Sequence, residues 1–444
     1  MTAKGPKKHS NAVETGSAIW KVARVFLGER VIFAFVNLAA VAIAVRAVGL
    51  EAMGAIGLLL AFARLIGDIT KFGSWKAIVS YGAPLRRADD RLALARLAGL
   101  TLWLDLAAIS AAVMLVVVGA QIFGQSLGWS PEMIAIAPWF AVATVFITHM
   151  TPTGLLRLEG RVLEVASHHA LTATCRLIGA LWLWLAGGGF IELAAIWVGS
   201  AIIAGGLLWT FSAFSARRMF GAPDLGATWR TGASEFHGFW KFAGVTNVTA
   251  TMNGAIMPFA TLAVGAMLGP AEAGIFHLVR QIAESLIRPA EILAQAAFPE
   301  LAKMAAEGGR KAVKAALNIS GVLALAIPLF IGALLWLVGA DFLELLFGAE
   351  ARAGAAVLTL TGVAATLHVS AFMLEPALMT VGRARSVLAS HIGGAIAFAA
   401  ALSLSVGPLG LVGVGVALLA FRITQPAIQI VAALRYLKTH PSVT

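Results

Sequence analysis

Twelve apolar stretches follow one another along nearly the whole chain, with short polar turns between them. About 20 apolar residues in a helix cross the ~30 Å hydrocarbon core of a bilayer. Because backbone polar groups find no water there, each stretch must form a helix. We therefore expect an all-α polytopic membrane protein, with spans at about 20–48, 54–82, 92–123, 134–156, 167–187, 190–215, 236–266, 274–299, 314–338, 352–379, 386–406 and 410–436.

Basic residues are unevenly distributed over the connecting segments. If the N-terminus lies in the cytoplasm, nearly all connecting Lys and Arg residues fall in cytoplasmic segments, and the outer loops hold only Arg46 and Arg352. This asymmetry predicts that both termini are cytoplasmic. The formal net charge of +11 reflects the same topology, and no nucleic-acid motif accompanies it, so we expect no nucleic-acid partner.

Two similar turns suggest an internal duplication. Gly49–Gly54 reads "GLEAMG", and Gly269–Gly274, 220 residues later, reads "GPAEAG". Each follows an odd-numbered span, and duplicated six-helix halves are common in transporters. We predict a cytoplasmic tail at 1–17, an N-lobe of six helices at 18–215, a cytoplasmic linker at 216–234, a C-lobe of six helices at 235–437, and a cytoplasmic tail at 438–444.

Charged residues occur at matching offsets after the two turns. Residues 10, 14 and 17 after Gly54 are Arg64, Asp68 and Lys71, and the same offsets after Gly274 give Glu284, Arg288 and Glu291. Every sign is reversed. Charges within a bilayer are costly and usually face a cavity or a partner. Two interpretations stay open: the faces oppose each other across a cleft, or each helix pairs its own i, i+4 charges, Arg64–Asp68 and Glu284–Arg288.

Arginines outnumber carboxylates within the predicted spans, which indicates an anionic ligand, and the planar guanidinium suits phosphate. Asn247 and Asn253 either line a wet cavity or bond to neighbouring helices. For Arg176 and Arg422, a buried structural pair and a ligand role both stay open. The predicted substrate-binding residues are Arg24, Arg30, Arg64, Arg280, Arg288, Asn247 and Asn253, and those predicted for gating or ion coupling are Asp68, Lys71, Glu284 and Glu291.

The chain carries none of the sequence patterns of an ATPase, a metal enzyme or a serine hydrolase. We therefore expect no catalytic residue, no metal and no bound cofactor. The carboxylates within spans, which also include Asp105 and Glu375, are consistent with coupling to a proton or sodium gradient. A uniport driven by consumption of the substrate outside is the alternative.

Two segments resemble a known family. "AVRAVGLEAMGAIGLLLAFARLIGDITKFG" (Ala44–Gly73) resembles the start of the lipid-linked oligosaccharide flippases, the O-antigen and exopolysaccharide translocases. "MLGPAEAGIFHLVRQI" (Met267–Ile282) resembles the equivalent point of their second half. These flippases belong to the multidrug/oligosaccharidyl-lipid/polysaccharide exporter (MOP) superfamily. The resemblance implies two pseudo-symmetric six-helix lobes in a V around a central cavity, lined by spans 1, 2, 7 and 8.

The related peptidoglycan-precursor flippases hold a pyrophosphate with arginines in spans 1, 2 and 8. Here Arg24 or Arg30, Arg64, and Arg280 or Arg288 occupy comparable spans. The match is by span and not by aligned motif. That group usually has fourteen spans, so the twelve predicted here disfavour that assignment.

The resemblance implies a flippase and not an enzyme. It would move an undecaprenyl-diphosphate-linked saccharide across the bacterial inner membrane by alternating access, for lipopolysaccharide or exopolysaccharide biosynthesis. Its expected partners are the lipid-linked oligosaccharide, membrane lipids, and the polysaccharide polymerase and export machinery, and we expect a monomer. One alternative is a drug or cation antiporter of the same superfamily. A membrane-embedded polysaccharide polymerase or ligase is disfavoured, because the outer loops are short.

Overall fold

The structure is a computed structural model that describes residues 10–148, 150–221, 234–285, 309–371 and 374–439. These residues are almost entirely helical, and no strand occurs among them, so the predicted all-α fold is confirmed. The helices are α1 (Ser10–Thr70), α2 (Ser74–Arg87), α3 (Arg91–Phe123), α4 (Pro131–Thr148), α5 (Met150–Glu159), α6 (Val162–Ala186), α7 (Phe190–Met219), α9 (Phe239–Gly254), α10 (Ile256–Leu268), α12 (Gly309–Phe347), the 3-10 helix η1 (Ala349–Gly354), α13 (Ala355–Ala371), α14 (Leu374–Thr380), α15 (Ala384–Leu409) and α16 (Leu411–Thr439). Residues 270–285 form a further helical segment.

The helices match the predicted spans, but spans 2 and 7 are each divided between two helices. The first span and the first half of the second form α1, which is interrupted at Gly49, and α2 completes the second span after a break at 71–73. Span 7 is likewise divided, into α9 and α10. In spans 4 and 10, residues 149 and 372–373 lie outside the described residues, between α4 and α5 and between α13 and α14. The second half of span 8 lies outside the described residues.

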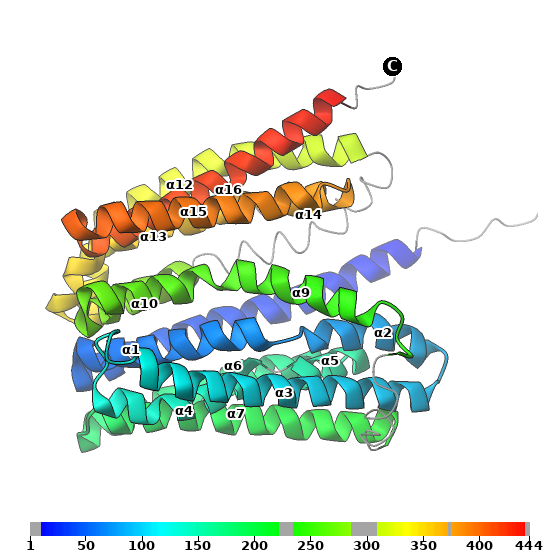
Figure 1. The fold of residues 1–444 in the computed structure, drawn as a ribbon, viewed down its shortest axis with the longest axis horizontal. Helices are drawn as coiled ribbons and strands as arrows, with labels where there is room; N and C mark the ends of the chain where they lie inside the picture. The colour runs from blue at the N-terminus through cyan, green and yellow to red at the C-terminus, as the bar shows by residue number, and fades with distance from the viewer. Residues whose placement is uncertain (1–9, 149, 222–233, 286–308, 372–373, 440–444) are drawn as a thin grey trace, which may run out of the picture.

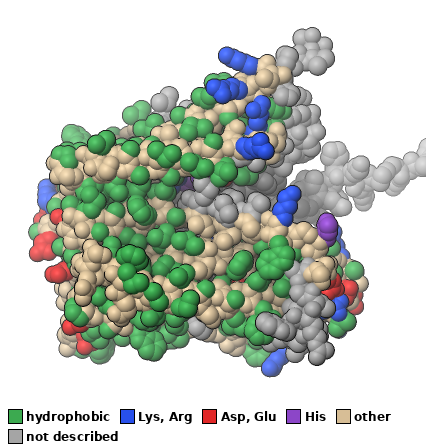
Figure 2. All heavy atoms as spheres, in the orientation of Figure 1, with side chains coloured by type: hydrophobic (Ala, Val, Ile, Leu, Met, Phe, Trp, Pro, Cys, Tyr) green, Lys and Arg blue, Asp and Glu red, His purple; other side chains and the backbone are tan. Residues whose placement is uncertain are grey.

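Seven helices in the described part of the chain are long and apolar enough to cross a membrane. They are Phe33–Thr70, Arg91–Phe123, Val162–Ala186, Phe190–Met219, Ala326–Phe347, Arg385–Leu409 and Leu411–Thr439. The shorter apolar helices Pro131–Thr144 and Ile256–Leu268 belong to spans 4 and 7. Large apolar side chains cover the outer surface (Figure 2), and Trp336, Leu404 and Leu185 are each more than 75% exposed. A surface of this kind suits lipid and not water. The protein is a multi-pass membrane protein.

The helices form two groups (Figure 1). The N-terminal group contains α1–α7, and the C-terminal group contains α9, α10, residues 270–285 and α12–α16. The groups lie close together at the left-hand end of Figure 1 and diverge toward the right-hand end, where the C-terminus lies. Figure 2 shows basic side chains mostly at the right-hand end and acidic side chains at both ends. The orientation in the membrane and the lobe boundaries stay predictions.

The two glycine turns meet where the groups are close. Gly49 has φ 87° and ψ 169°, and Gly269 has φ 97° and ψ 174°, so both have the same positive-φ backbone that glycine permits. A Cβ added to Gly54 would lie 1.9 Å from the carbonyl oxygen of Pro270, and one added to Gly274 would lie 2.2 Å from that of Leu50. The turns therefore pack against each other symmetrically.

One apolar core joins both groups at this end. It includes Ile56 and Leu58 of α1, Val264 of α10, Phe276 in 270–285, and Leu343 of α12. A second cluster, at the other end, places Phe236 and Phe239 against Ala77 of α2 and Leu97 of α3. The beginning of α9 thus packs on the N-terminal group, although it opens the predicted C-lobe.

Candidate functional site

The site lies along the seam between α1 and residues 270–285. The helices approach closely there, because a Cβ on Gly57 would lie 2.9 Å from Nδ1 of His277. Close approach of small residues is a usual basis of helix packing in membranes. The seam places His277 and, one helical turn later, Arg280 against the N-terminal group.

A cluster of cations surrounds this point. Arg280 is 8% exposed, and its Nε lies 3.6 Å from Oε1 of Glu284. Arg64 of α1 is close enough to Arg280 for their like charges to interact, and Arg176 of α6 is similarly close to His277. We call Arg64, Arg176, His277 and Arg280 the seam cluster. Three arginines from three helices thus lie along the seam, and Arg280 among them pairs with Glu284.

Contacts on α7 hold Arg176 in the seam cluster. Its Nε donates a hydrogen bond to Oγ of Ser200 at 3.3 Å, and its guanidinium lies 5.3 Å from the centre of the Trp197 ring. Guanidinium groups bind aromatic faces favourably, particularly when water is excluded. The α7 side chains therefore fix an arginine that the sequence did not assign to the site.

Several buried polar atoms in this region have no hydrogen-bond partner among the described residues. They are Nδ1 of His277, Nε of Arg280 and Oε1 of Gln281. Buried polar atoms are nearly always paired, so unpaired ones suit a site that binds water or a ligand. Arginine donors and an imidazole suit an anionic group with several oxygens.

In the segment "RLIGDITK" (Arg64–Lys71), Asp68 has a partner that neither interpretation named, and so does Glu284. Asp68 pairs with Lys71 at i+3, and Glu284 pairs with Arg280 at i−4. The physical reason is that a carboxylate on a helix reaches basic side chains both three and four residues away, in either direction. The proposed partners Arg288 and Glu291 lie outside the described residues.

The Asp68 end of α1 contacts α9 instead. Oγ1 of Thr251 donates to the carbonyl oxygen of Asp68 at 2.7 Å, and Nδ2 of Asn247 donates to that of Ile69 at 3.4 Å. A Cβ on Gly254 would lie 2.9 Å from Oδ2 of Asp68. Asn247 is thus at the interface between the groups, as expected for a side chain that bonds to a neighbouring helix.

Three predicted substrate-binding side chains are not described. Arg24 and Arg30 lie in α1 and Asn253 lies in α9, but the structure describes only their backbone. The residues that sequence reasoning did not assign are Arg176, His277 and Gln281. The sequence shows Arg176 and His277 as charged or titratable residues in apolar stretches, which is a signal of function, but it does not show that their helices meet.

A second polar cluster lies within the C-terminal group. Nη1 of Arg422 lies 2.7 Å from Nδ1 of His368, and Nε2 of His391 lies 3.4 Å from Oε2 of Glu375. Gln425 connects the two pairs through contacts with Arg422 and His391. Arg422 therefore has the buried structural partner that the sequence left open.

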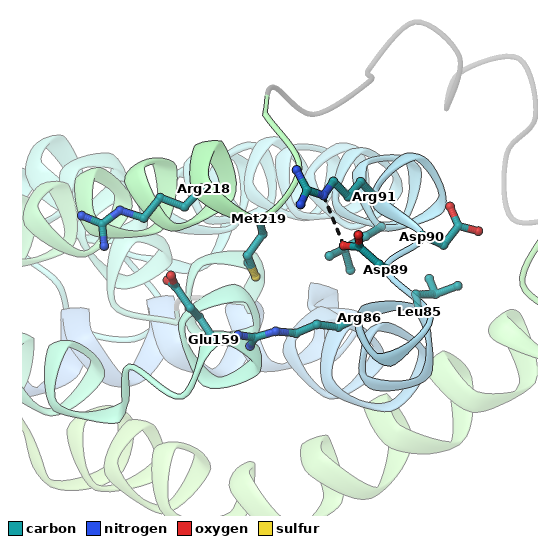
Figure 3. A pocket seen from close by; sticks show the side chains of 9 residues that line it. Leu85, Arg86, Asp89, Asp90, Arg91, Glu159, Arg218 and Met219 are labelled. Carbon is teal, nitrogen blue, oxygen red and sulfur yellow. Dashed lines mark hydrogen bonds and ion pairs between the residues drawn. The ribbon is translucent and has the colours of Figure 1, made fainter.

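A separate cavity of about 270 Å³ lies at the right-hand end of the N-terminal group. Figure 3 shows Arg86, Arg218 and Glu159 around it, with Asp89 and Arg91 joined by a hydrogen bond of 3.2 Å. Its lining mixes both signs of charge and comes from α2, α3, α5 and α7 and the α2–α3 turn. It is distinct from the seam cluster.

No family model matches the chain. It is 24% identical to the Escherichia coli (strain K12) inner membrane protein YghQ over 323 residues, which cover 72% of this chain and 90% of that protein. Among solved structures, it is similar to an inward-facing multidrug resistance MATE family transporter of the MOP superfamily, with a TM-score of 0.72, 16% identity, and coverage of 94% of this chain and 98% of that one.

An outward-facing structure of such a transporter gives a TM-score of 0.63, with 17% identity and coverage of 94% and 96%. These likenesses extend over nearly the whole chain and establish the fold: about twelve helices in two lobes. The chain is more similar to the inward-facing structure than to the outward-facing one.

Proposed function

We propose that the protein is an alternating-access transporter. The support is its fold, which it shares with transporters that are known in inward-facing and outward-facing conformations. Rocking of two lobes about a fixed site is the usual way in which such a fold exposes one site to each side in turn. The close contact of the glycine turns at one end and the divergence of the groups at the other fit an inward-facing conformation.

For the substrate, we propose an undecaprenyl-diphosphate-linked saccharide. The observation that carries this proposal is the seam cluster, in which the charges of Arg64 and Arg176 reach Arg280 and His277 and buried donors lack partners. Arginine binds phosphate oxygens with paired N–H groups. In this scheme the diphosphate binds the seam cluster, the sugar occupies the space between the lobes, and the lipid tail stays in the bilayer.

A drug or cation antiporter is the second candidate, and the comparisons favour it over the flippase. The similar solved structures are named as multidrug resistance transporters. A cationic substrate requires carboxylates that are free of basic partners, and both Asp68 and Glu284 are paired with cations. The seam cluster therefore argues for the anionic substrate, while the relatives argue for the cationic one.

The name of YghQ supports a location in the bacterial inner membrane. Cytoplasmic termini, a monomeric state, and coupling to a proton or sodium gradient complete the proposal. A polysaccharide polymerase and export machinery would consume the translocated product and so drive the flux outward.

The test compares both substrate classes in proteoliposomes. The probes are a fluorescent undecaprenyl-diphosphate saccharide and a fluorescent cationic drug. We expect wild-type protein to flip the lipid and Arg280→Ala to lose at least about tenfold in rate, the loss of one charged hydrogen bond. Arg280→Lys should recover part of this, because lysine lacks the planar fork.

Arg352→Ala is the matched control, since Arg352 forms ion pairs with Asp341 and Glu344 near the outer end and away from the seam. It should flip the lipid at the wild-type rate. Gradient-driven drug export without lipid flipping, and unaffected by Arg280→Ala, would establish the antiporter instead.

A further inference from the structure

A buried carboxylate connects α2 and α5 in the N-terminal group. Asp105 lies on α3 and is 3% exposed. Oγ of Ser74 donates a hydrogen bond to its Oδ1 at 2.6 Å, and the backbone N–H of Thr151 donates to its Oδ2 at 2.6 Å. Each oxygen therefore accepts one short hydrogen bond, and the two donors come from different helices.

One donor, Ser74, stands at the beginning of a half-helix. α1 ends at Thr70, and α2 begins at Ser74 after Gly73, whose φ is 64°. The first N–H groups of a helix are unpaired and carry partial positive charge. In transporters, the ends of interrupted helices are recurrent ion sites.

No ion pair with Asp105 occurs in the described part of the chain. The nearby helices do carry cations, but these have other contacts. Lys71 pairs with Asp68, while Lys76 and Arg157 lie over the Trp75 ring at 5.6 Å and 4.3 Å from its centre. A buried carboxylate without a cationic partner is costly within a membrane, so the neutral acid is a competitive state.

A hydrogen-bond acceptor lies next to Asp105 for the O–H group of its neutral form. The Thr151 hydroxyl interacts with the Asp105 carboxyl, but its buried Oγ1 forms no hydrogen bond of ordinary geometry among the described residues. A protonated carboxyl has one O–H donor, and a hydroxyl oxygen accepts such a bond. The missing hydrogen bond at Oγ1 of Thr151 is thus explained if the Asp105 carboxyl alternates between its charged and neutral forms.

We propose that Asp105 is a proton-binding site that controls the break at 71–73. The proton adds to one carboxyl oxygen, and the new O–H donates to Oγ1 of Thr151. The hydrogen bonds from Ser74 and Thr151 lose their charge assistance, so the beginning of α2 is held less firmly. The break is next to Lys71, which pairs with the carboxylate of Asp68. The backbone carbonyl of Asp68 accepts the hydrogen bond of Thr251 from α9. Protonation therefore reaches the contact between the two groups of helices.

Infrared difference spectroscopy of the purified protein tests proton binding directly, and it needs no substrate. Acidification should produce a carboxylic acid carbonyl band that Asp105→Asn abolishes. The matched control is Asp90→Asn, because Asp90 is on the same helix and caps it through the Ala93 N–H at 3.0 Å, but it is exposed. A band that persists unchanged in Asp105→Asn overturns the proposal.

A second variant covers the case in which Asp105→Asn does not fold. Thr151→Val keeps the carboxyl and the backbone N–H but removes the hydroxyl acceptor. The acid band should then move to the frequency of a carboxyl whose O–H has no hydrogen-bond partner. An unchanged frequency would show that the Thr151 hydroxyl does not receive the proton, which contradicts the proposed site.

Spin labels test the link to the helix contact, which rests on the proposed alternating access. Cysteines replace the exposed residues Ile69 and Trp240, in a Cys175→Ser background that has no other cysteine. Acidification should change the label distance in this background but not when Asp105→Asn is added. A constant distance despite a normal acid band would overturn the coupling and leave proton binding intact. Failure of either substrate assignment affects neither measurement.

Discussion

Gly54 and Gly274 determine how closely the two halves approach each other. Each has backbone of the opposite half where a Cβ would have to lie, at 1.9 Å and 2.2 Å respectively. Contacts below about 3 Å between such atoms are not tolerated, and backbone yields less readily than a side-chain end. These two positions therefore accept no larger residue without separation of the halves.

We predict that Gly54→Ala destabilises the protein by about 1–3 kcal/mol, the usual cost of overpacking. Gly67→Ala is the matched control on the same helix, since no atom lies within 4 Å of the Cβ that it adds. In a helix interior that change stabilises by up to about 1 kcal/mol. Thermal unfolding in detergent measures both variants. Equal behaviour of the two would show that the turns do not pack as described.

The sequence predicted these turns but not the ion pairs, and the difference has a physical reason. A positive φ at Gly49 and Gly269, and an absent Cβ at Gly54 and Gly274, both demand glycine at fixed spacing. Charge pairing has no such requirement. Asp68 had basic residues at i−4 and i+3, and spacing alone does not decide between them. The sequence also did not predict that Arg176 belongs to the seam cluster, because this depends on which helices meet.

At the scale of the element, apolar length predicted the spans but not their breaks. A divided span has the same continuous hydropathy as an intact one. One break has a visible cause: Pro258 lacks an N–H and its ring crowds the carbonyl of Gly254, where α9 ends. The break at 71–73 lies beside the Asp68–Lys71 pair and beside the Thr251 contact, so it divides span 2 close to the point where α1 contacts α9.

The Thr251 hydrogen bond to the end of α1 should stabilise this contact by about 1 kcal/mol. We therefore predict that Thr251→Val shifts the local equilibrium about fivefold toward separation of α1 and α9. The rate of disulfide formation between cysteines at positions 69 and 247, in the Cys175→Ser background, measures it and should fall.

Thr261→Val is the control for this change. Oγ1 of Thr261 donates to the carbonyl oxygen of Met257 within α10, so its loss leaves the contact between the groups intact. If both valine variants cross-link at the same rate, the Thr251 hydrogen bond does not hold α9 against α1.

At the scale of the whole molecule, the sequence predicted two lobes but not which end is closed. Both conformations of an alternating-access protein bury nearly the same apolar spans, and they differ by only a few kcal/mol. The difference lies in a small number of contacts at each end. Here the left-hand end of Figure 1 is closed by the glycine turns and by Arg46 of α1.

Arg46 binds the end of a helix from the opposite group. Its guanidinium donates to the carbonyl oxygens of Leu345 and Leu346 at the end of α12, the latter at 3.2 Å. The last carbonyls of a helix are unpaired and carry partial negative charge, so a cation there is favourable. Within the described residues, this contact joins α1 directly to α12, beyond the apolar core.

We predict that Arg46→Ala opens this end. Hydrogen bonds from a charged donor contribute about 1.5–3 kcal/mol, so the conformational equilibrium should shift by about one to two orders of magnitude. Spin labels on cysteines that replace the exposed residues Glu51 and Glu350 report the opening as a longer distance. Arg46→Lys should retain part of the closed population, because lysine keeps the charge but not the second donor direction.

Arg352→Ala is the control, since Arg352 pairs with Asp341 at 3.0 Å and with Glu344 inside the C-terminal group. It removes an arginine near the end of α12 without cutting a bond between the groups, so its distance distribution should match that of wild type. Equal distributions for Arg46→Ala and Arg352→Ala would show that the glycine turns alone keep this end closed.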